Sequence, residues 1–320
     1  MYQWLSERLA YLTARVGLAV GCLAVKLLPR RCLYYLSDSL AYAGFYLFRG
    51  FRTRSTANIV TALGTQIPPT AVQGLVYRSL RNFFRDFVEL GIALVLPAGK
   101  LRAEIPLVGR EHLDSALSRG NGIIVLSAHL GNFFLLGTRL AMEGYPVYVL
   151  VNQPKHGRFT ELLDNYRLKI QQRTIHARPR QQALRELGRV LRRNEIAVVI
   201  ADEHRRGGGI EVPFFGRTVS ARRGPATVAL RTGAAVVPAY LLREADHSLR
   251  LVVEPELELV RDQKSKPEVR ENMLRITQWL ERIVRSYPDQ WNWMNVQWYM
   301  NDTKSLLADR QSARLIEERE

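Results

Sequence analysis

The chain has 320 residues, of which 47% are hydrophobic and 24% charged, so it is long enough for one large folded core or two smaller ones. It carries 46 lysines and arginines against 30 aspartates and glutamates, a formal charge of +16, which favours anionic partners such as lipid head groups, an acidic protein or nucleic acid. Its two cysteines, Cys22 and Cys32, exclude a disulfide framework or a cysteine-based zinc site and fit a reducing compartment.

Residues 1–100 are predicted to form a helical region, with breaks at Pro29 and at Pro68 and Pro69. Aromatic residues and arginines alternate between residues 34 and 54. The spacing of the aromatic residues suits a helix packed on an apolar surface, and the arginines suit lipid phosphates. A nucleic-acid face is the weaker alternative, because the sequence contains no recognised nucleic-acid-binding module.

Residues 9–28 are mostly apolar but contain Arg15 and Lys26, which makes them borderline for a membrane span of roughly 20 apolar residues. We expect this helix to lie in or dip through the cytoplasmic leaflet with its charges reaching the surface, and an ordinary buried helix is the alternative. Glu7 and Arg8 interrupt the pattern of a signal peptide, so the segment is expected to be retained.

From residue 101 the pattern changes to short apolar runs that alternate with helical segments. The apolar runs are 122–128, 146–151, 196–201 and 234–242, and the helical segments include 158–172, 181–193 and 268–287. This alternation predicts an α/β fold with a mixed, mostly parallel sheet flanked by helices. Residues 249–259 alternate apolar and polar side chains and predict an antiparallel edge strand. The predicted division is an N-terminal helical, membrane-associating subdomain (1–100), an α/β core (101–300) and a polar tail (301–320).

His129 ends an apolar run and is followed by Gly131 and Asn132 at the start of a predicted helix. The glycine permits close backbone approach, and a helix start offers N–H groups to an anion. Because ligands collect at the carboxyl ends of parallel strands, His129 is a candidate catalytic residue, with a core histidine as the alternative.

A second cluster follows the apolar run 196–201 and precedes three glycines. Five ionisable side chains in a row are costly to bury, so they are expected to face a cleft, with a solvated hairpin as the alternative. They are Asp202, Glu203, His204, Arg205 and Arg206.

Two further segments carry candidate binding residues. Arg222 and Arg223 precede a predicted helix that ends at Gly233, and they suit either a phosphate clamp or a basic surface pair. Trp291, Trp293, Trp298 and Tyr299 suit a membrane interface or the lid of an acyl tunnel, and a second hydrophobic core equally well. The glycine and histidine signatures of hydrolases, nucleotidases and dehydrogenases are missing from the sequence.

Taken in order, these motifs resemble the lipid A biosynthesis acyltransferases, the lauroyl and myristoyl transferases of Gram-negative bacteria within the lysophospholipid acyltransferase superfamily. The resemblance covers about residues 5 to 300 and rests on RTRSTANIVTAL (52–63), RSLRNFFRDFVEL (78–90), SAHLGNF (127–133), VPFFG (212–216), GPATVALRTGAAVVP (224–238) and YPDQWNW (287–293).

This resemblance implies a membrane-associated enzyme at the cytoplasmic face of the bacterial inner membrane. Its expected partners are the membrane surface, an acyl carrier protein thioester as donor (or acyl-CoA) and a glycolipid or phospholipid acceptor, with no nucleic acid, metal or cofactor. The expected reaction moves a fatty acyl chain to a hydroxyl of a lipid A-type glycolipid precursor. The alternatives are transfer to an ornithine lipid or lysophospholipid, and a non-catalytic lipid-binding relative.

The resemblance also implies that His129 is the general base that activates the acceptor hydroxyl. The family has a Glu or Asp after four intervening residues, where this chain has Phe134, whose side chain cannot accept a hydrogen bond from the imidazole. We expect the orienting acceptor to be Asp202 or Glu203, less favourably Glu89, or a backbone carbonyl.

By the same resemblance, Arg167 is expected to stabilise the oxyanion or to hold a phosphate. Gln153 and Pro154 stand where the family often has Arg-Pro. The predicted catalytic residues are thus His129, Arg167, Asp202 and Glu203, and the predicted substrate-binding residues are Gly131, Asn132, Arg205, Arg222 and Arg223.

Overall fold

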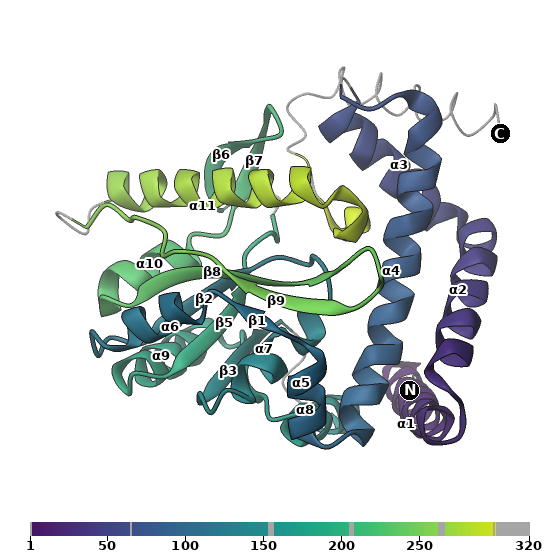
Figure 1. Ribbon diagram of the computed structural model, residues 1–320. Coiled ribbons are helices and arrows are strands. Elements are labelled where there is room, and N and C mark those ends of the chain that lie inside the picture. Colours follow the sequence, from purple (N-terminus) through teal and green to yellow (C-terminus); the bar gives the residue numbers. More distant parts are fainter. Residues whose placement is uncertain are drawn as a thin grey trace.

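The computed structural model describes residues 2–64, 66–152, 157–204, 208–261, 266–296 and 298. The N-terminal helices stand beside a sheet that is itself covered by helices (Figure 1). These N-terminal helices are α1 (Tyr2–Leu27), α2 (Arg30–Leu47), α3 (Arg49–Leu63), α4 (Pro69–Val95) and α5 (Ala98–Glu104). Pro29 caps α2 and Pro69 begins α4, which confirms the predicted breaks, because proline fits the first turn of a helix but not its interior.

The predicted fold class is confirmed: the molecule is α/β, with a mostly parallel seven-stranded sheet in the order β1-β9-β8-β2-β5-β3-β4. Among these pairs only β8 and β9 run antiparallel. The strands are β1 (Leu107–Val108), β2 (Ile123–Ser127), β3 (Val147–Val151), β4 (Arg173–His176), β5 (Ile196–Ile200), β8 (Ala235–Arg243) and β9 (Leu249–Val253). A separate antiparallel hairpin is made by β6 (Ile210–Phe214) and β7 (Arg217–Ala221).

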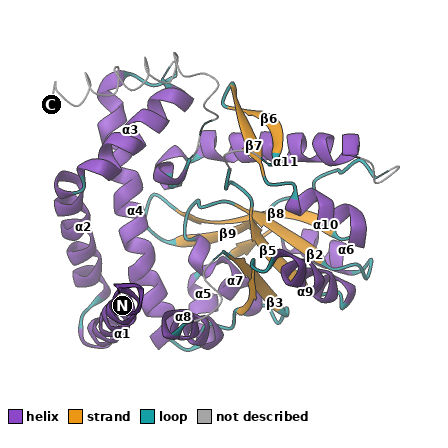
Figure 2. Ribbon diagram, turned by 180° about the vertical axis from the view of Figure 1, so that it is seen from behind, coloured by secondary structure: helices purple, strands orange, loops and turns teal. Residues whose placement is uncertain are grey.

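Helices cover both faces of the sheet, as Figure 2 shows from behind. All five residues of β2 are buried; Val125 belongs to the apolar cluster that contains Leu136, and Leu126 to the opposite cluster that contains Ile276. This burial on both sides explains why the strands read as continuous apolar runs. The helices are α6 (Arg110–Leu117), α7 (Phe133–Ala141), α8 (Arg158–Lys169), α9 (Arg180–Arg192), α10 (Gly224–Thr232) and α11 (Lys266–Ser286), followed by the short η1 (Pro288–Gln290) and η2 (Trp293–Asn295).

The predicted antiparallel strand at 249–259 is confirmed only in part. Residues 249–253 form β9 and pair antiparallel with β8, whereas 254–259 are not a strand. The edge position was wrong, because β1 pairs in parallel with the outer side of β9. Two residues are too few to give β1 a recognisable alternation in the sequence. The predicted tail, 301–320, lies outside the described residues.

Helix α1 exposes a row of apolar side chains that are 53–70% accessible: Leu12, Val16, Val20, Leu23 and Leu27. Their spacing of three or four residues places them on one face of the helix. Residues 11–27 contain no fully buried side chain, so α1 is not the ordinary buried helix that was the alternative. Within the described part of the chain, no helix combines the length and the apolarity that a membrane crossing requires.

Candidate active site

The register of the sheet brings His129 and Asp202 together. Strands β2 and β5 are parallel neighbours in which Ser127 is paired with Ile200, so the two residues that follow each strand emerge at the same edge. Asp202 Oδ1 lies 2.8 Å from His129 Nδ1, and Asp202 Oδ2 accepts a hydrogen bond of 2.8 Å from the main-chain N–H of His129. One carboxylate therefore fixes both the position of the histidine and the direction of its ring.

Asp202 is itself held by a tryptophan from the C-terminal segment. The indole Nε1 of Trp291 donates to Asp202 Oδ2 at 2.7 Å, and the Asp202 side chain is 3% exposed. Burial would raise the pKa of this carboxyl, but the adjacent His129 and the hydrogen bonds outweigh burial and lower it. Burial likewise opposes protonation of His129, yet the Asp202 charge raises the histidine pKa above 6.5. The pair is an imidazole whose Nδ1–H donates to an ionised carboxylate.

The turn that carries the histidine, hereafter the His129 turn (residues 128–132), is held tightly. Gly131 has φ +57°, and a Cβ at this position would lie 2.1 Å from the carbonyl oxygen of Leu241, so the turn requires glycine. The Gly131 N–H donates to the Gln290 carbonyl at 2.9 Å. Asn132 caps α7 by accepting from the Leu135 N–H, and its side chain is fully buried. The side chain of Asn132, which was expected to bind substrate, therefore points into the protein and is absent from the lining of the large cavity.

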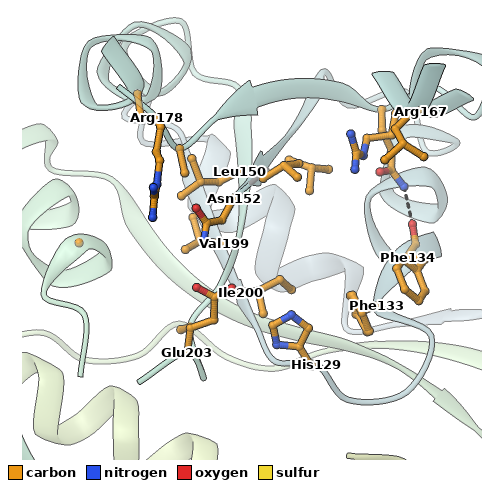
Figure 3. Close-up of a pocket in the computed structure, with 18 of the residues that line it drawn as sticks. His129, Phe133, Phe134, Leu150, Asn152, Arg167, Arg178, Val199, Ile200 and Glu203 are labelled. Carbon is orange, nitrogen blue, oxygen red and sulfur yellow. Dashed lines mark hydrogen bonds between the residues drawn. The ribbon is translucent and has the colours of Figure 1, made fainter. Parts of the chain in front are cut away.

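A cavity of about 1180 Å³ opens on one side of the His129 ring. Its walls are mainly apolar and come from α1, α4, α8, α9 and α10 as well as from the strand ends, and Figure 3 shows part of them. Gly17 and Gly21 of α1 line it, and a Cβ added at either position would meet nothing within 4 Å. Among the described residues, Nε2 of His129 has no hydrogen-bond partner, so this nitrogen is free to take a proton.

Phe134 belongs to an aromatic wall of this cavity. Its ring lies 4.1 Å from that of Phe133 and 5.5 Å from that of Phe87 on α4 (centroid distances). The polar contact at this residue is made by its main chain: the Phe134 carbonyl accepts a hydrogen bond of 2.7 Å from Gln172 Nε2, which is drawn in Figure 3. The position that is acidic in the resembling family is thus an apolar surface element here.

The predicted arginines take different positions. Arg167 pairs with Asp164 at 2.9 Å and lies across the cavity from His129, with Phe133 nearer to the histidine (Figure 3). Burial is the largest cause that lowers the Arg167 pKa.

Elsewhere on the cavity wall Arg222 pairs with Glu203 at 2.6 Å, and Arg223 also lines the cavity. Glu203 therefore serves Arg222 and not the His129 ring, whose Nδ1 is occupied by Asp202. The residues of the predicted motifs that lie outside the described part of the chain are Gln153, Pro154, Arg205, Arg206 and Tyr299.

A second cavity, of about 420 Å³, touches His129 as well. It is lined largely by aromatic and aliphatic side chains of α3, α4 and the C-terminal segment, and Gly131 and Phe133 contribute to its wall. The tryptophans of that segment belong to the hydrophobic core: Trp291 is 2% exposed and Trp293 is fully buried. Of the interpretations left open for the tryptophan cluster, burial in a hydrophobic core holds for these two residues, but it is the core cluster that also contains Leu126 of the sheet and not a second, separate core. Among the described residues, no group of His, Cys, Asp or Glu could hold a metal ion.

Two residues of the site were not assigned from the sequence. Trp291 was noted only as part of a tryptophan cluster, and no local signal ties it to Asp202, 89 residues earlier. Glu89 was considered for the histidine ring, but it contacts Asn132 instead, at 2.7 Å. A carboxylate on the buried face of a helix was the signal in the sequence that Glu89 has polar partners inside the protein, because buried carboxylates require them.

Comparison with known proteins adds independent information. The family model described as "Bacterial lipid A biosynthesis acyltransferase" matches residues 2–300. A phosphatidylinositol mannoside acyltransferase of Mycolicibacterium smegmatis is 28% identical over 78% of this chain and 79% of its own length, and its counterpart in Mycobacterium tuberculosis is 26% identical over 92% and 91%. The lipid A biosynthesis palmitoleoyltransferase of Escherichia coli is 22% identical over 69% and 70%. The chain belongs to the bacterial lipid A biosynthesis acyltransferase family.

Proposed function

We propose that this acyltransferase moves a fatty acyl chain from a thioester donor to a hydroxyl of a membrane glycolipid, with His129 as general base. The observation that carries the proposal is the 2.8 Å contact between His129 Nδ1 and Asp202 at the wall of a large apolar cavity. The cavity suits an aliphatic chain, and the oriented imidazole suits proton removal from a hydroxyl.

In the proposed reaction, Nε2 of neutral His129 takes the proton of the acceptor hydroxyl while the oxygen attacks the thioester carbonyl. Asp202 keeps the ring proton on Nδ1, so Nε2 presents its lone pair, and the carboxylate stabilises the imidazolium that forms. The C–O bond forms as the C–S bond breaks, and His129 returns the proton to the leaving thiolate. This cycle leaves the enzyme unchanged, and the acid at position 134 is unnecessary for it.

We assign Arg167 to holding a substrate anion rather than the oxyanion, because it lies across the cavity from His129 (Figure 3). Arg222 and Arg223 line the same cavity and suit a second phosphate. Acyl carrier protein and acyl-CoA both carry a phosphate at the far end of the pantetheine arm that bears the thioester, and the basic chain, with a formal charge of +16, attracts either donor.

For the acceptor, the relatives are named for phosphatidylinositol mannoside and for lipid A. Both lipids are anionic glycolipids with free sugar hydroxyls, and we propose that this class supplies the acceptor. A lipid A-type precursor is the first candidate and a phosphatidylinositol mannoside the second.

We further propose that α1 and α2 rest on the cytoplasmic surface of the inner membrane. The apolar row of α1 is joined by Leu36, Leu40 and Leu47 of α2, which are 50–76% exposed. Because α1 also lines the large cavity, a lipid chain could pass from the bilayer to the site without crossing water. Leu23→Glu should weaken cosedimentation with anionic vesicles, whereas the matched Val108→Glu, at a 48% exposed site on β1, should not.

The central test is transfer by the purified protein in detergent. Lauroyl, myristoyl and palmitoyl donors, each on acyl carrier protein and on CoA, are offered with a lipid A precursor or a phosphatidylinositol mannoside. We expect an acylated glycolipid, and His129→Ala should abolish it while His112→Ala, a change on the surface helix α6, retains it. Undiminished transfer by His129→Ala would refute the base assignment. Bound lipid in native mass spectrometry without transfer in any combination would show a lipid-binding protein instead.

A further inference from the structure

A buried group of polar side chains lies beneath the His129 turn and centres on Glu89 of α4. Both oxygens of its 5% exposed carboxylate are engaged. Oε2 accepts from Asn132 Nδ2 at 2.7 Å and from Arg243 at 2.9 Å. Oε1 accepts from the Tyr34 hydroxyl at 3.2 Å and from the other terminal nitrogen of Arg243. One side chain thus connects α4, the last residue of β8 and the turn that carries the histidine.

The contact with Glu89 fixes the orientation of the Asn132 amide. A carboxylate only accepts, so Asn132 must direct its NH2 group to Glu89 and its oxygen to the Leu135 N–H, 3.3 Å away. The Asn132 main-chain N–H donates to the Leu241 carbonyl at 2.8 Å. All polar groups of Asn132, three residues after His129, are therefore hydrogen-bonded within the protein.

Arg243 is the cation that faces the two carboxyl groups beneath the turn. Asp86, one helical turn before Glu89, accepts from Arg243 at 3.0 Å, and these three side chains are 4–6% exposed. Burial, reinforced by the charge of Glu89, raises the pKa of Asp86 well above its ordinary value. Burial alone would lower the pKa of Arg243, but the two carboxyl groups raise it overall. The Arg243 cation thus contacts both carboxyl groups, which offsets the cost of burying them against Asn132.

From this geometry we infer that Glu89 is a positioning residue for the transfer reaction: it acts through Asn132 to hold the His129 turn in the conformation that aims the imidazole at the cavity. The inference rests on the proposed function. It gives the buried carboxylate a role in turnover beyond stabilising the packing of α4 on the sheet.

A swap of the donor and the acceptor tests this role. In Glu89→Gln, either orientation of the amide places its NH2 group against a terminal nitrogen of Arg243, so a donor faces a donor and Asn132 loses its carboxylate acceptor. In Asn132→Asp, two carboxylates face each other. In the double variant the new amide at position 89 donates to the new carboxylate at position 132 and still accepts from Arg243, while that carboxylate still accepts from the Leu135 N–H. The double variant therefore restores the hydrogen bond between positions 89 and 132 with the same net charge, whereas the second contact with Arg243 and the long one with the Asp86 carbonyl are not regained.

We expect each single variant to lower kcat about 10–100-fold, with the KM of the donor nearly unchanged because Asn132 lines neither cavity. The double variant should regain at least about tenfold of that loss. Glu104→Gln, which removes a Glu–Arg pair of 2.7 Å on the surface, is the matched control and should leave kcat unchanged.

Hydrogen–deuterium exchange of residues 127–136 provides a readout that needs no substrate. Exchange should be faster in both single variants and should return toward the wild-type rate in the double variant. Wild-type kcat and exchange in the single variants would overturn the inference, and so would equal losses of kcat in all three variants. If the wild-type protein transfers no acyl group, the proposed function fails, whereas the exchange rates still decide whether Glu89 holds the turn.

Discussion

Replacing Asp202 by asparagine gives the sharpest test of the site, because the structure dictates how the new amide must lie. Asp202 Oδ2 accepts two hydrogen bonds, from the His129 N–H and from Trp291 Nε1, whereas Oδ1 accepts one, from His129 Nδ1. The amide oxygen will take the position with two donors, since the reverse orientation leaves both of them opposed by an NH2 group. The NH2 group then faces Nδ1 of the histidine.

In Asp202→Asn, Nδ1 must therefore become an acceptor, and the ring proton moves to Nε2. This is the wrong tautomer for a base that has to receive a proton on Nε2. We expect kcat to fall about 10²–10⁴-fold, which corresponds to about 2.7–5.4 kcal/mol of lost transition-state stabilisation. KM should change little, because Asp202 is absent from the residues that line the cavity.

The assay is the initial rate of acyl transfer as a function of pH. In the wild type, kcat/KM should fall as the pH decreases through the raised pKa of His129, above 6.5, because the base is lost by protonation. In Asp202→Asn the fall of the residual kcat/KM should shift to lower pH, because the charge that raises the His129 pKa is gone. Asp114→Asn, on the surface helix α6, is the matched control. A kcat within about threefold of wild type in Asp202→Asn would refute the tautomer argument.

Three other substitutions have defined outcomes. Burial lowers the pKa of His204 to about 4, so between pH 6.5 and 4 the unfolded chain binds a proton that the folded protein does not, and the free energy of unfolding falls as the pH decreases through that window. His204→Phe should remove up to about 3 kcal/mol of this pH dependence in denaturant titrations. An unchanged dependence on pH would contradict the burial of a neutral His204. Gly17→Leu places a side chain in the open space of the large cavity and should reduce kcat/KM for palmitoyl more than for lauroyl donors. The control Gly50→Leu, also unobstructed but at a residue that does not line this cavity, should not; equal effects of both would refute the role of α1. Phe134→Glu should give no gain in transfer rate, because Nδ1 of His129 is already engaged by Asp202. The carboxylate placed in an apolar wall should instead lower kcat/KM by about tenfold. A faster enzyme would show that Asp202 alone orients the ring poorly.

The sequence predicted the sheet because its central strands are buried on both faces. Apolar runs such as the one that ends at Ser127 give a signal that needs no partner to be recognised. The two residues of β1 and the partly polar β4 (Arg173–His176) gave no such signal, because an edge strand is defined by its neighbour. The position of His129 at a strand end was predictable on the same basis.

The partners of the histidine were only partly predictable. Asp202, Glu203 and Glu89 all remained candidates for the orienting group, because the sequence does not reveal how the chain turns after β5. The structure distinguishes them by geometry: Asp202 contacts the ring, Glu203 pairs with Arg222, and Glu89 binds Asn132. Each of these contacts depends on how helices and strands far apart in the sequence pack together. Such packing produces no periodic pattern of residues from which it could be predicted. The predicted division at residue 100 stays a prediction.

The hydrogen bond between Trp291 and Asp202 has a consequence for how the protein is made. The segment that contains Trp291 also supplies the Gln290 carbonyl to Gly131 and the Asn292 N–H to the His129 carbonyl, at 3.0 Å. Since a chain emerges from the ribosome in order from its N-terminus, the sheet and its histidine can fold while these three contacts are still unmade. The apolar cavity can therefore exist on a nascent chain before a competent proton acceptor does. If the proposed mechanism holds, we expect full activity only after the chain has been synthesised past Asn292.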